Sequence, residues 1–104
     1  MSKLILDNLS DEEKRFVKYM SDNHSGKEKA IKAKELKKEF GNTRKIRLMT
    51  HSLRLEGIPI CTGQTGYYFA SSEEEVKESI RYIDSYIDDL NKVRQGLKKS
   101  VSLF

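Results

Sequence analysis

The sequence predicts a small α+β fold that is mostly helical, and three observations predict it. Apolar residues recur at helical spacing in residues 11–21, 33–40 and 43–57. Two short β-prone runs, residues 58–61 and 67–70, flank Thr-Gly-Gln-Thr-Gly, whose glycines permit a hairpin. The last third of the chain carries one long apolar heptad pattern. This order of elements predicts a winged helix-turn-helix with a small β-hairpin wing and a long C-terminal amphipathic helix.

Length and composition indicate one compact domain. The 104 residues are 37% hydrophobic and 35% charged, so the core must be small. We expect residues 1–71 to form the winged-helix domain and residues 72–104 the C-terminal helix with a short tail. The apolar run 4–6 is too short for a signal peptide, and nothing approaches the roughly 20 apolar residues of a membrane span. A lone cysteine, Cys61, fits a reducing compartment and a small hydrophobic role in a strand. We therefore expect a cytoplasmic protein.

Capping and turn residues mark the first two helices. Ser10 and Glu13 form the S-x-x-E pattern of a capping box at the start of the first helix. After a polar loop, Ala30 and Ile31 are placed to add a short strand beside the wing. The second helix stops at Gly41, whose tolerance of positive φ suits a tight turn into the third.

The third helix has two distinct sides. It opens at Asn42 or Thr43, both able to cap a helix. The side that we expect to face the core is formed by Ile46, Met49, Thr50 and Leu53. The outward side carries Arg44, Leu48, His51 and Leu55, flanked by Arg47 and Arg54. The outward side is therefore where we look for function.

The wing tyrosines fall on opposite faces of one strand. Tyr67 directly follows Gly66 and is expected in the core, so alternation sends Tyr68 to the other, exposed face. On this basis we expect the loss of Tyr67 to destabilise the fold more than the loss of Tyr68.

The last helix has a second capping box, Ser72 and Glu75, and a heptad stripe. The stripe consists of Val76, Ile80, Ile83, Ile87, Leu90 and Leu97, with Arg94 in the intervening position and Tyr82, Tyr86 and Val93 alongside. Such a helix is longer than a wing-sized core requires. It either packs against the same helix of a second copy or folds back across the first helix, and the sequence leaves both arrangements open.

Charge divides the chain into a basic middle and an acidic helix. Residues 24–54 contain ten Lys and Arg against three Glu, a net charge of +7. Residues 73–89 contain two cationic and seven acidic side chains, a net charge of −5. Clustering of cations on the predicted helix-turn-helix favours contact with phosphates, and the alternative is a solvated lysine-rich surface.

No arrangement of residues typical of catalysis or cofactor binding is present in the sequence. His24, His51 and Cys61 have no repeated short spacing and lack a fourth zinc ligand. The pair Gly26-Lys27 lacks the preceding glycine of a P-loop. We therefore expect a protein that is not an enzyme and that has no metal or other cofactor.

The string LRLEGIPICTGQTGYYFASSEEEV, followed by a helical tail ending near RQGLKKS, carries a family resemblance. It is similar to small winged-helix proteins encoded by bacteriophages of Gram-positive bacteria. The matching residues are Leu53, Arg54, Gly57, Pro59, Ile60, Gly66, Tyr67, Tyr68 and Ala70. The resemblance covers residues 33–99 and implies a DNA-binding viral protein of phage replication or early-gene regulation, acting in the cytoplasm of the bacterial host.

Two functions remain open, and the first is binding to DNA, most readily double-stranded. Arg44, Arg47 and His51 would reach base edges, and Arg54 or Lys45 would contact phosphate. Gln64 and Thr65 of the wing would touch the adjacent backbone. A homodimer through the last helix would require two half-sites related by two-fold symmetry.

The second function is a protein-binding module that inhibits a host replication or defence factor, for example a CRISPR component. Leu48 and Leu55 lie on the outward side, where apolar groups gain nothing from phosphates, although Leu55 is also placed to cover residues 4–6. Tyr68, Tyr82 and Tyr86, if exposed, suit a protein interface. The residues expected at a partner or dimer interface are Leu48, Leu55, Tyr82, Ile83, Tyr86, Ile87 and Leu90.

Overall fold

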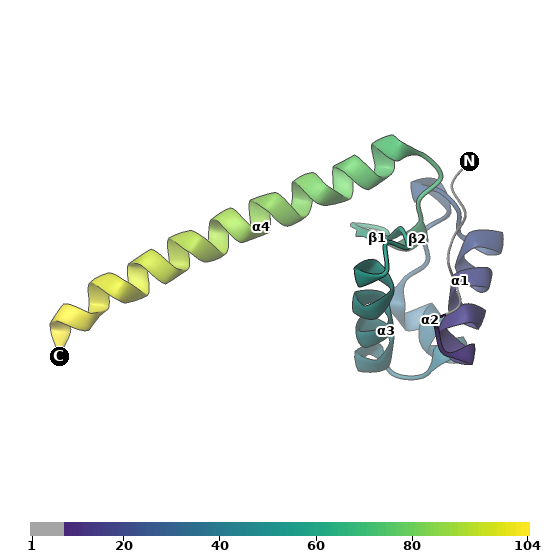
Figure 1. Cartoon of the computed structure of the whole chain (residues 1–104), viewed down its shortest axis with the longest axis horizontal. Coiled ribbons are helices and arrows are strands. Elements are labelled where there is room, and N and C mark those ends of the chain that lie inside the picture. The colour runs from purple at the N-terminus through teal and green to yellow at the C-terminus, as the bar shows by residue number, and fades with distance from the viewer. Residues whose placement is uncertain (1–7) are drawn as a thin grey trace.

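The computed structural model describes residues 8–104, in which three short helices and a β-hairpin form one body and a long helix projects from it (Figure 1). The elements are α1 (Asp11–Asn23), the 3-10 turn η1 (Lys27–Lys29), α2 (Ala33–Phe40), α3 (Thr43–Leu55), β1 (Ile60–Gly63), β2 (Gly66–Phe69), α4 (Glu73–Ser100) and η2 (Val101–Leu103). The predicted mostly helical α+β fold, with a small antiparallel sheet and a long C-terminal helix, is confirmed. The apolar run 4–6 and its contact with Leu55 lie outside the described residues. Within residues 8–104, no helix is both long and apolar enough to cross a membrane.

The predicted capping box starts α1. Ser10 Oγ accepts a hydrogen bond from the Glu13 amide at 3.1 Å, and Glu13 Oε1 accepts one from the Ser10 amide at 2.9 Å. The bond from the Ser10 backbone lowers the pKa of Glu13 below its usual value. The carboxylate thus stays charged beside the positive end of the helix dipole, which stabilises this first turn.

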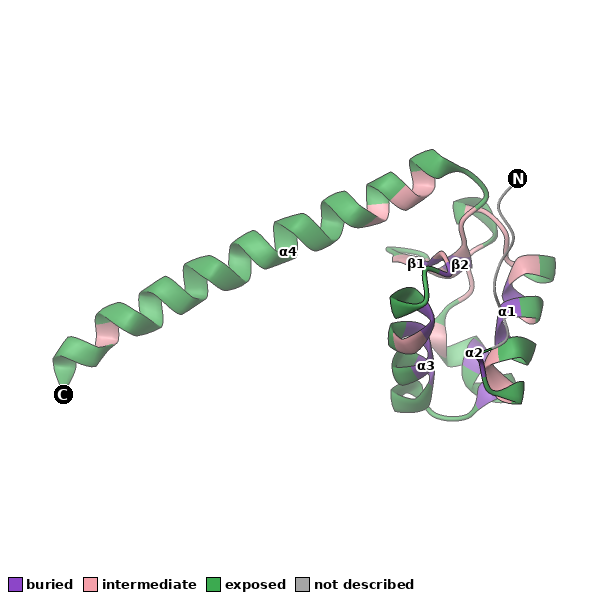
Figure 2. Ribbon diagram, in the orientation of Figure 1, coloured by how far each residue is buried: buried purple, intermediate pink, exposed green. Residues whose placement is uncertain are grey.

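The core lies where α1, α2 and α3 face one another, and buried residues line these inner sides (Figure 2). Phe16 and Phe40 meet edge to face with ring centroids 5.0 Å apart, and the Arg15 guanidinium lies 4.2 Å above the Phe40 ring. The fully buried side chains include Phe16, Met20, Leu36, Phe40, Ile46 and Leu53. The three short helices therefore complete one another's apolar faces.

Gly41 and Asn42 make the turn between α2 and α3 as predicted. Gly41 has φ 96°, a conformation that favours glycine, and Asn42 Oδ1 caps α3 by accepting the Lys45 amide at 2.8 Å. The core-facing side of α3 is buried as expected, namely Ile46, Met49, Thr50 and Leu53. One side of α3 is thereby fixed inward and the other is left to solvent.

The hairpin is offset from its predicted bounds, residues 58–61 and 67–70. Ile60 pairs with Phe69 and Gly63 with Gly66, so the turn holds two residues instead of five. The Ile58 amide donates to Leu53 O and thereby closes the end of α3. Pro59 has no amide hydrogen to donate. These two residues therefore belong to the connection and not to the strand, while Cys61 is a buried strand residue as expected.

A loop between α1 and α2 covers the other edge of β2. Ile31 and Tyr67 exchange two backbone hydrogen bonds, of 2.8 and 2.7 Å. Phe69 accepts from the Gly26 amide and donates to His24 O, both at 2.8 Å. The expected pairing of this segment with the hairpin is confirmed at Ile31.

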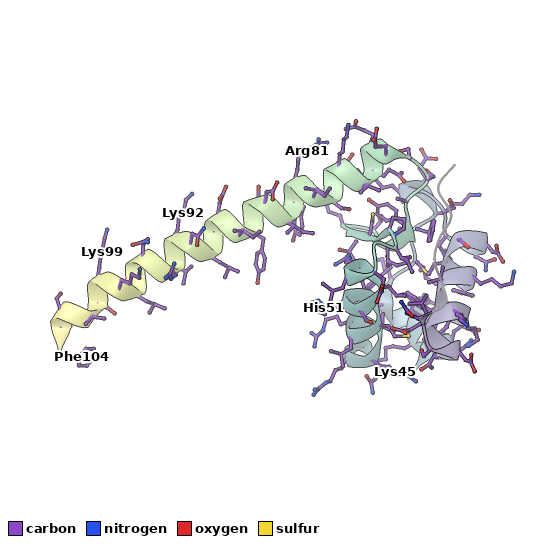
Figure 3. All side chains as sticks on the ribbon, in the orientation of Figure 1. Lys45, His51, Arg81, Lys92, Lys99 and Phe104 are labelled. Carbon is purple, nitrogen blue, oxygen red and sulfur yellow. The ribbon has the colours of Figure 1, made fainter. Side chains whose placement is uncertain are left out.

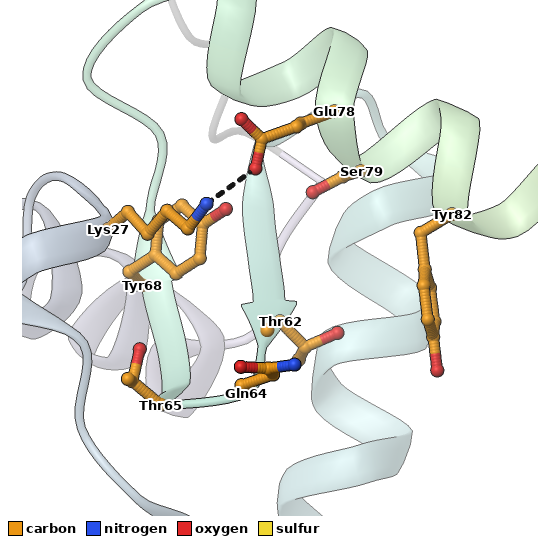
Figure 4. A pocket seen from close by; sticks show the side chains of 9 residues that line it. Lys27, Thr62, Gln64, Thr65, Tyr68, Glu78, Ser79 and Tyr82 are labelled. Atoms are coloured by element: carbon orange, nitrogen blue, oxygen red, sulfur yellow. Dashed lines mark hydrogen bonds and ion pairs between the residues drawn. The ribbon is translucent and has the colours of Figure 1, made fainter.

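The relative burial predicted for the two tyrosines of β2 is wrong. Tyr67 does face the main core but is only partly buried, whereas Tyr68 on the opposite face retains 2% exposure. The reason is that the first turns of α4 lie across that opposite face, as the positions of Tyr68, Glu78 and Ser79 show (Figure 4). Alternation along the strand was predicted correctly, and the covering helix was not. Tyr68 is therefore not an exposed anchor for a partner.

α4 is attached to the body through its first two turns. Ser72 Oγ accepts the Glu75 amide at 3.3 Å, but the Glu75 carboxylate does not return to Ser72 as a capping box requires. It accepts instead from the Ser71 amide at 2.8 Å and the Lys27 amide at 2.9 Å. The helix then leaves the body and does not fold back across α1 (Figure 1). The apolar side of α1 already packs against β2 and against Phe40 of α2.

Candidate nucleic-acid interface

The outward side of α3 is a solvent-exposed surface that combines cations with leucines. Arg44, Leu48, His51 and Leu55 are all exposed, as predicted, and so is Arg47. His51 points away from α1, on the side of the body from which α4 extends (Figure 3). The leucines are prominent there, with 58% exposure at Leu48 and 76% at Leu55. We call this set of five residues the α3 face.

Lys45 lies beside the α3 face but carries a neutralised charge. Its ammonium lies 2.7 Å from Glu12 Oε2, an ion pair that joins the first turn of α3 to the first turn of α1. A phosphate at this position would compete with the carboxylate. Lys45 is therefore a weaker candidate for phosphate binding than the sequence indicated.

Arg54 connects α3 to the hairpin. Its Nε donates to the carbonyl oxygen of Ile60 at 2.7 Å, and its Nη2 donates to Thr62 Oγ1 at 3.2 Å. Two of the directed donors of the guanidinium are thus committed to β1. Arg54 fixes the position of the hairpin against the end of α3, and its charge remains at that junction.

Arg44 and Arg47 have no ion-pair partner among residues 8–104. Both sit in the first turn and a half of α3. An arginine with an unengaged guanidinium offers a planar set of donors that matches a phosphate or the edge of a guanine. These two side chains are the strongest anion-binding candidates of the predicted set.

The hairpin turn and Arg44 lie at opposite ends of α3. Gln64 and Thr65 form the exposed two-residue turn, and Arg54 ties β1 to the last turn of the helix. Arg44 is ten residues earlier, about 15 Å along the helix axis. The predicted site residues thus form an extended surface, with cations at one end and a polar turn near the other.

A cleft between the hairpin and α4 was not predicted. Its volume is about 570 Å³, and among its lining residues the Lys27 ammonium lies 2.7 Å from Glu78 Oε1 (Figure 4). Its lining includes Lys27, Thr62, Gln64, Thr65, Tyr68, Glu78, Ser79 and Tyr82. Burial raises the pKa of Tyr68, and the bond to Glu78 raises the pKa of Lys27. The residues come from three distant segments, so no local sequence pattern marks the cleft.

Among residues 8–104, no group of three or more His, Cys, Asp and Glu side chains is arranged to hold a metal ion. Within that range, the His24 imidazole has a structural contact, since its Nδ1 lies 2.8 Å from Lys29 O. Comparisons of the chain with family models, curated proteins and solved structures found no significant match. Function must therefore be argued from the α3 face and its surroundings.

Proposed function

We propose that this chain is a non-enzymatic DNA-binding protein of the winged-helix type, in which α3 is the recognition helix and the hairpin is the wing. The order α1, α2, Gly41 turn, α3 and hairpin supports this assignment. So does the net charge of +7 over residues 24–54. The sequence resemblance to phage winged-helix proteins favours a role in phage replication or early-gene regulation.

One observation carries the proposal: Arg44 and Arg47 are exposed and unpaired on the outward side of a helix whose inward side is fully packed. A helix held in this way presents its cations at fixed positions, as insertion into the major groove of duplex DNA requires. His51 lies farther along the same side and would contact the next base edges. Gln64 and Thr65 would meet the backbone beyond the end of the helix.

A protein-binding role is the second candidate, and the exposure of Leu48 and Leu55 favours it specifically. Apolar side chains gain little against phosphates but become anchors when a protein partner removes them from water. The partner in this case would be a host replication or defence protein. The two functions use the same α3 face but depend on different residues.

The deciding experiment compares two variants of the α3 face for binding to duplex DNA at several salt concentrations. Under the DNA proposal, Arg44→Ala with Arg47→Ala weakens binding, and the slope of log affinity against log salt shrinks by about 0.9 for each phosphate that the variant no longer neutralises. Leu48→Ala then leaves the affinity for duplex DNA nearly unchanged. Lys14→Ala with Lys29→Ala is the matched control, since it removes the same charge from exposed positions outside α3.

The opposite pattern would favour the protein-binding role. Leu48→Ala would then weaken capture of a host protein with little salt dependence, and the arginine variant would change mainly the association rate. An intact protein without salt-sensitive affinity for DNA at low ionic strength would contradict the DNA proposal.

A further inference from the structure

Most of α4 is an apolar face that its own chain leaves uncovered. Every residue from Ile80 to Lys99 is exposed (Figure 2). The large apolar side chains on one side of the helix and its extension are Ile80, Ile83, Ile87, Leu90, Leu97 and Val101, which we call the α4 seam. At about 1.5 Å per residue the seam is roughly 30 Å long. An exposed apolar face of this length marks an interaction surface.

The spacing of residues in the seam is that of a coiled coil with a second copy of α4, and the position of Arg94 distinguishes a parallel from an antiparallel pair. With Arg94 included, the seam positions are spaced 3, 4, 3, 4, 3 and 4 from Ile80 to Val101, as in a coiled coil. In a parallel pair each position faces itself, so Arg94 would meet Arg94 of the second copy inside an apolar contact. Two like charges there are strongly unfavourable. In an antiparallel pair centred near residue 92, Arg94 faces Leu90 of the second copy instead.

The same antiparallel register matches the remaining seam residues. Ile87 faces Leu97 of the second copy, and Ile83 faces Val101. Leu97 and Val101 belong to a shallow, mainly apolar groove lined by Leu90, Val93, Arg94, Leu97, Lys98 and Val101. The isoleucines of the second copy would enter this groove.

Charge along α4 favours the same direction. Residues 73–89 carry a net charge of −5, whereas residues 90–104 contain four cationic side chains and no acidic one, a net charge of +4. An antiparallel pair brings each acidic half beside a basic half. A parallel pair would align acidic with acidic and basic with basic, which opposes association.

We propose that α4 pairs with α4 of a second copy as an antiparallel two-stranded coiled coil centred near residue 92. The two bodies then lie at opposite ends of the pair, with the first turns of α4 roughly 55 Å apart. This pairing does not depend on what the α3 face binds, so either function of that face leaves it unchanged.

Cysteine crosslinking of the full chain tests whether the two copies of α4 run parallel or antiparallel. We expect Ile87→Cys and Leu97→Cys, each oxidised alone, to give no disulfide-linked dimer, and an equal mixture of the two to give one. The wild-type chain, whose Cys61 is buried, is the control for background crosslinking. Crosslinking of either single variant alone would overturn the proposal in favour of a parallel pair. A dimer that crosslinks in none of the samples would overturn the proposed register.

Sedimentation of the unmodified chain tests whether the pair forms at all. We expect a concentration-dependent dimer that Ile87→Glu weakens at least about tenfold, because a carboxylate would enter an apolar contact in both copies. Ser85→Glu adds the same charge on the opposite side of α4 and should leave the dimer intact. Circular dichroism checks that both variants fold. A wild-type chain that stays monomeric at high concentration would overturn the proposal.

Discussion

The body buries the apolar sides of its helices, whereas α4 leaves most of its apolar side exposed to solvent. In α1, α2 and α3 the apolar side of each helix packs against another element of the same chain, and side chains such as Leu36 and Ile46 have no exposed surface. α4 is the longest helix and has no buried residue, although its apolar pattern is as regular. The comparison shows that periodicity predicts a helix and its apolar side, whereas burial depends on which partner that side meets.

The largest expected change in stability is at Tyr68, where the start of α4 covers the hairpin. Tyr68→Ala should lower the free energy of unfolding by about 3–5 kcal/mol, because it removes a buried aromatic side chain from between the hairpin and α4. Tyr82→Ala makes the same change at an exposed position of α4 and should stay within about 0.5 kcal/mol of the wild type. Urea unfolding measures both. Equal losses of unfolding free energy in Tyr68→Ala and Tyr82→Ala would contradict this difference, because Tyr82 would then be packed as closely as Tyr68.

Replacing a glycine by alanine should lower the stability in the body and raise it in α4. Gly66 has φ 125°, and a Cβ there would collide with the carbonyl group of Ile31, so Gly66→Ala should destabilise by about 1–3 kcal/mol. Gly96 lies in α4 with open space around it, and Gly96→Ala should stabilise the helix by up to about 1 kcal/mol. Thermal unfolding followed by circular dichroism provides the comparison. A stabilised Gly66→Ala variant would contradict the close approach between β2 and Ile31.

The stability of the junction between the body and α4 should depend on pH. Hydrogen bonds from the Ser71 and Lys27 amides lower the pKa of Glu75 below its usual value near 4.5. The stabilisation is therefore complete above that value and is lost as the pH falls through the lower pKa of the folded state. We expect the difference in Tm between wild type and Glu75→Gln to be largest near neutral pH and to shrink under acid.

Glu74→Gln is the control for this junction, since the Glu74 carboxylate contacts Arg81 within α4 itself. That variant should leave the Tm of the body unchanged. A constant difference between wild type and Glu75→Gln across the acid range would show that Glu75 does not hold α4 through its charge.

The smallest effect is expected at a buried hydroxyl of the body. Thr50 Oγ1 is buried and has no hydrogen-bond partner among the described residues. Thr50→Val removes this unsatisfied group and should leave stability unchanged or raise it by up to about 1 kcal/mol. Thr62→Val is the matched control, because it removes the acceptor of Arg54 Nη2 and should be destabilising. A marked loss of stability in Thr50→Val would contradict the view that this hydroxyl is unsatisfied.

Local signals in the sequence predicted most of the body correctly. Ser10 with Glu13, Gly41 and Asn42 each act within a few residues of their own position, and the structure confirms all of them. The inward and outward sides of α3 were also predictable, because helical periodicity fixes which residues share a side.

Long-range contacts explain what the sequence could not predict. Lys45 is neutralised by Glu12 and Arg54 is held by β1, so neither side chain keeps the full freedom that binding a phosphate needs. The cleft at Lys27 and Glu78 joins residues 51 positions apart. The burial of Tyr68 depends on α4. Each of these outcomes depends on a tertiary contact that no local pattern encodes.

The hydrogen bonds between residues 24–31 and β2 have a consequence for the rigidity of the body. They close a loop of chain around α2 and α3, and Arg54 ties the end of α3 to the same hairpin. The α3 face is therefore held by bonds that are already in place, and a ligand that docks on it as proposed would cost the chain little conformational entropy. We expect its association kinetics to be set by encounter and charge steering, with no slow rearrangement step after docking.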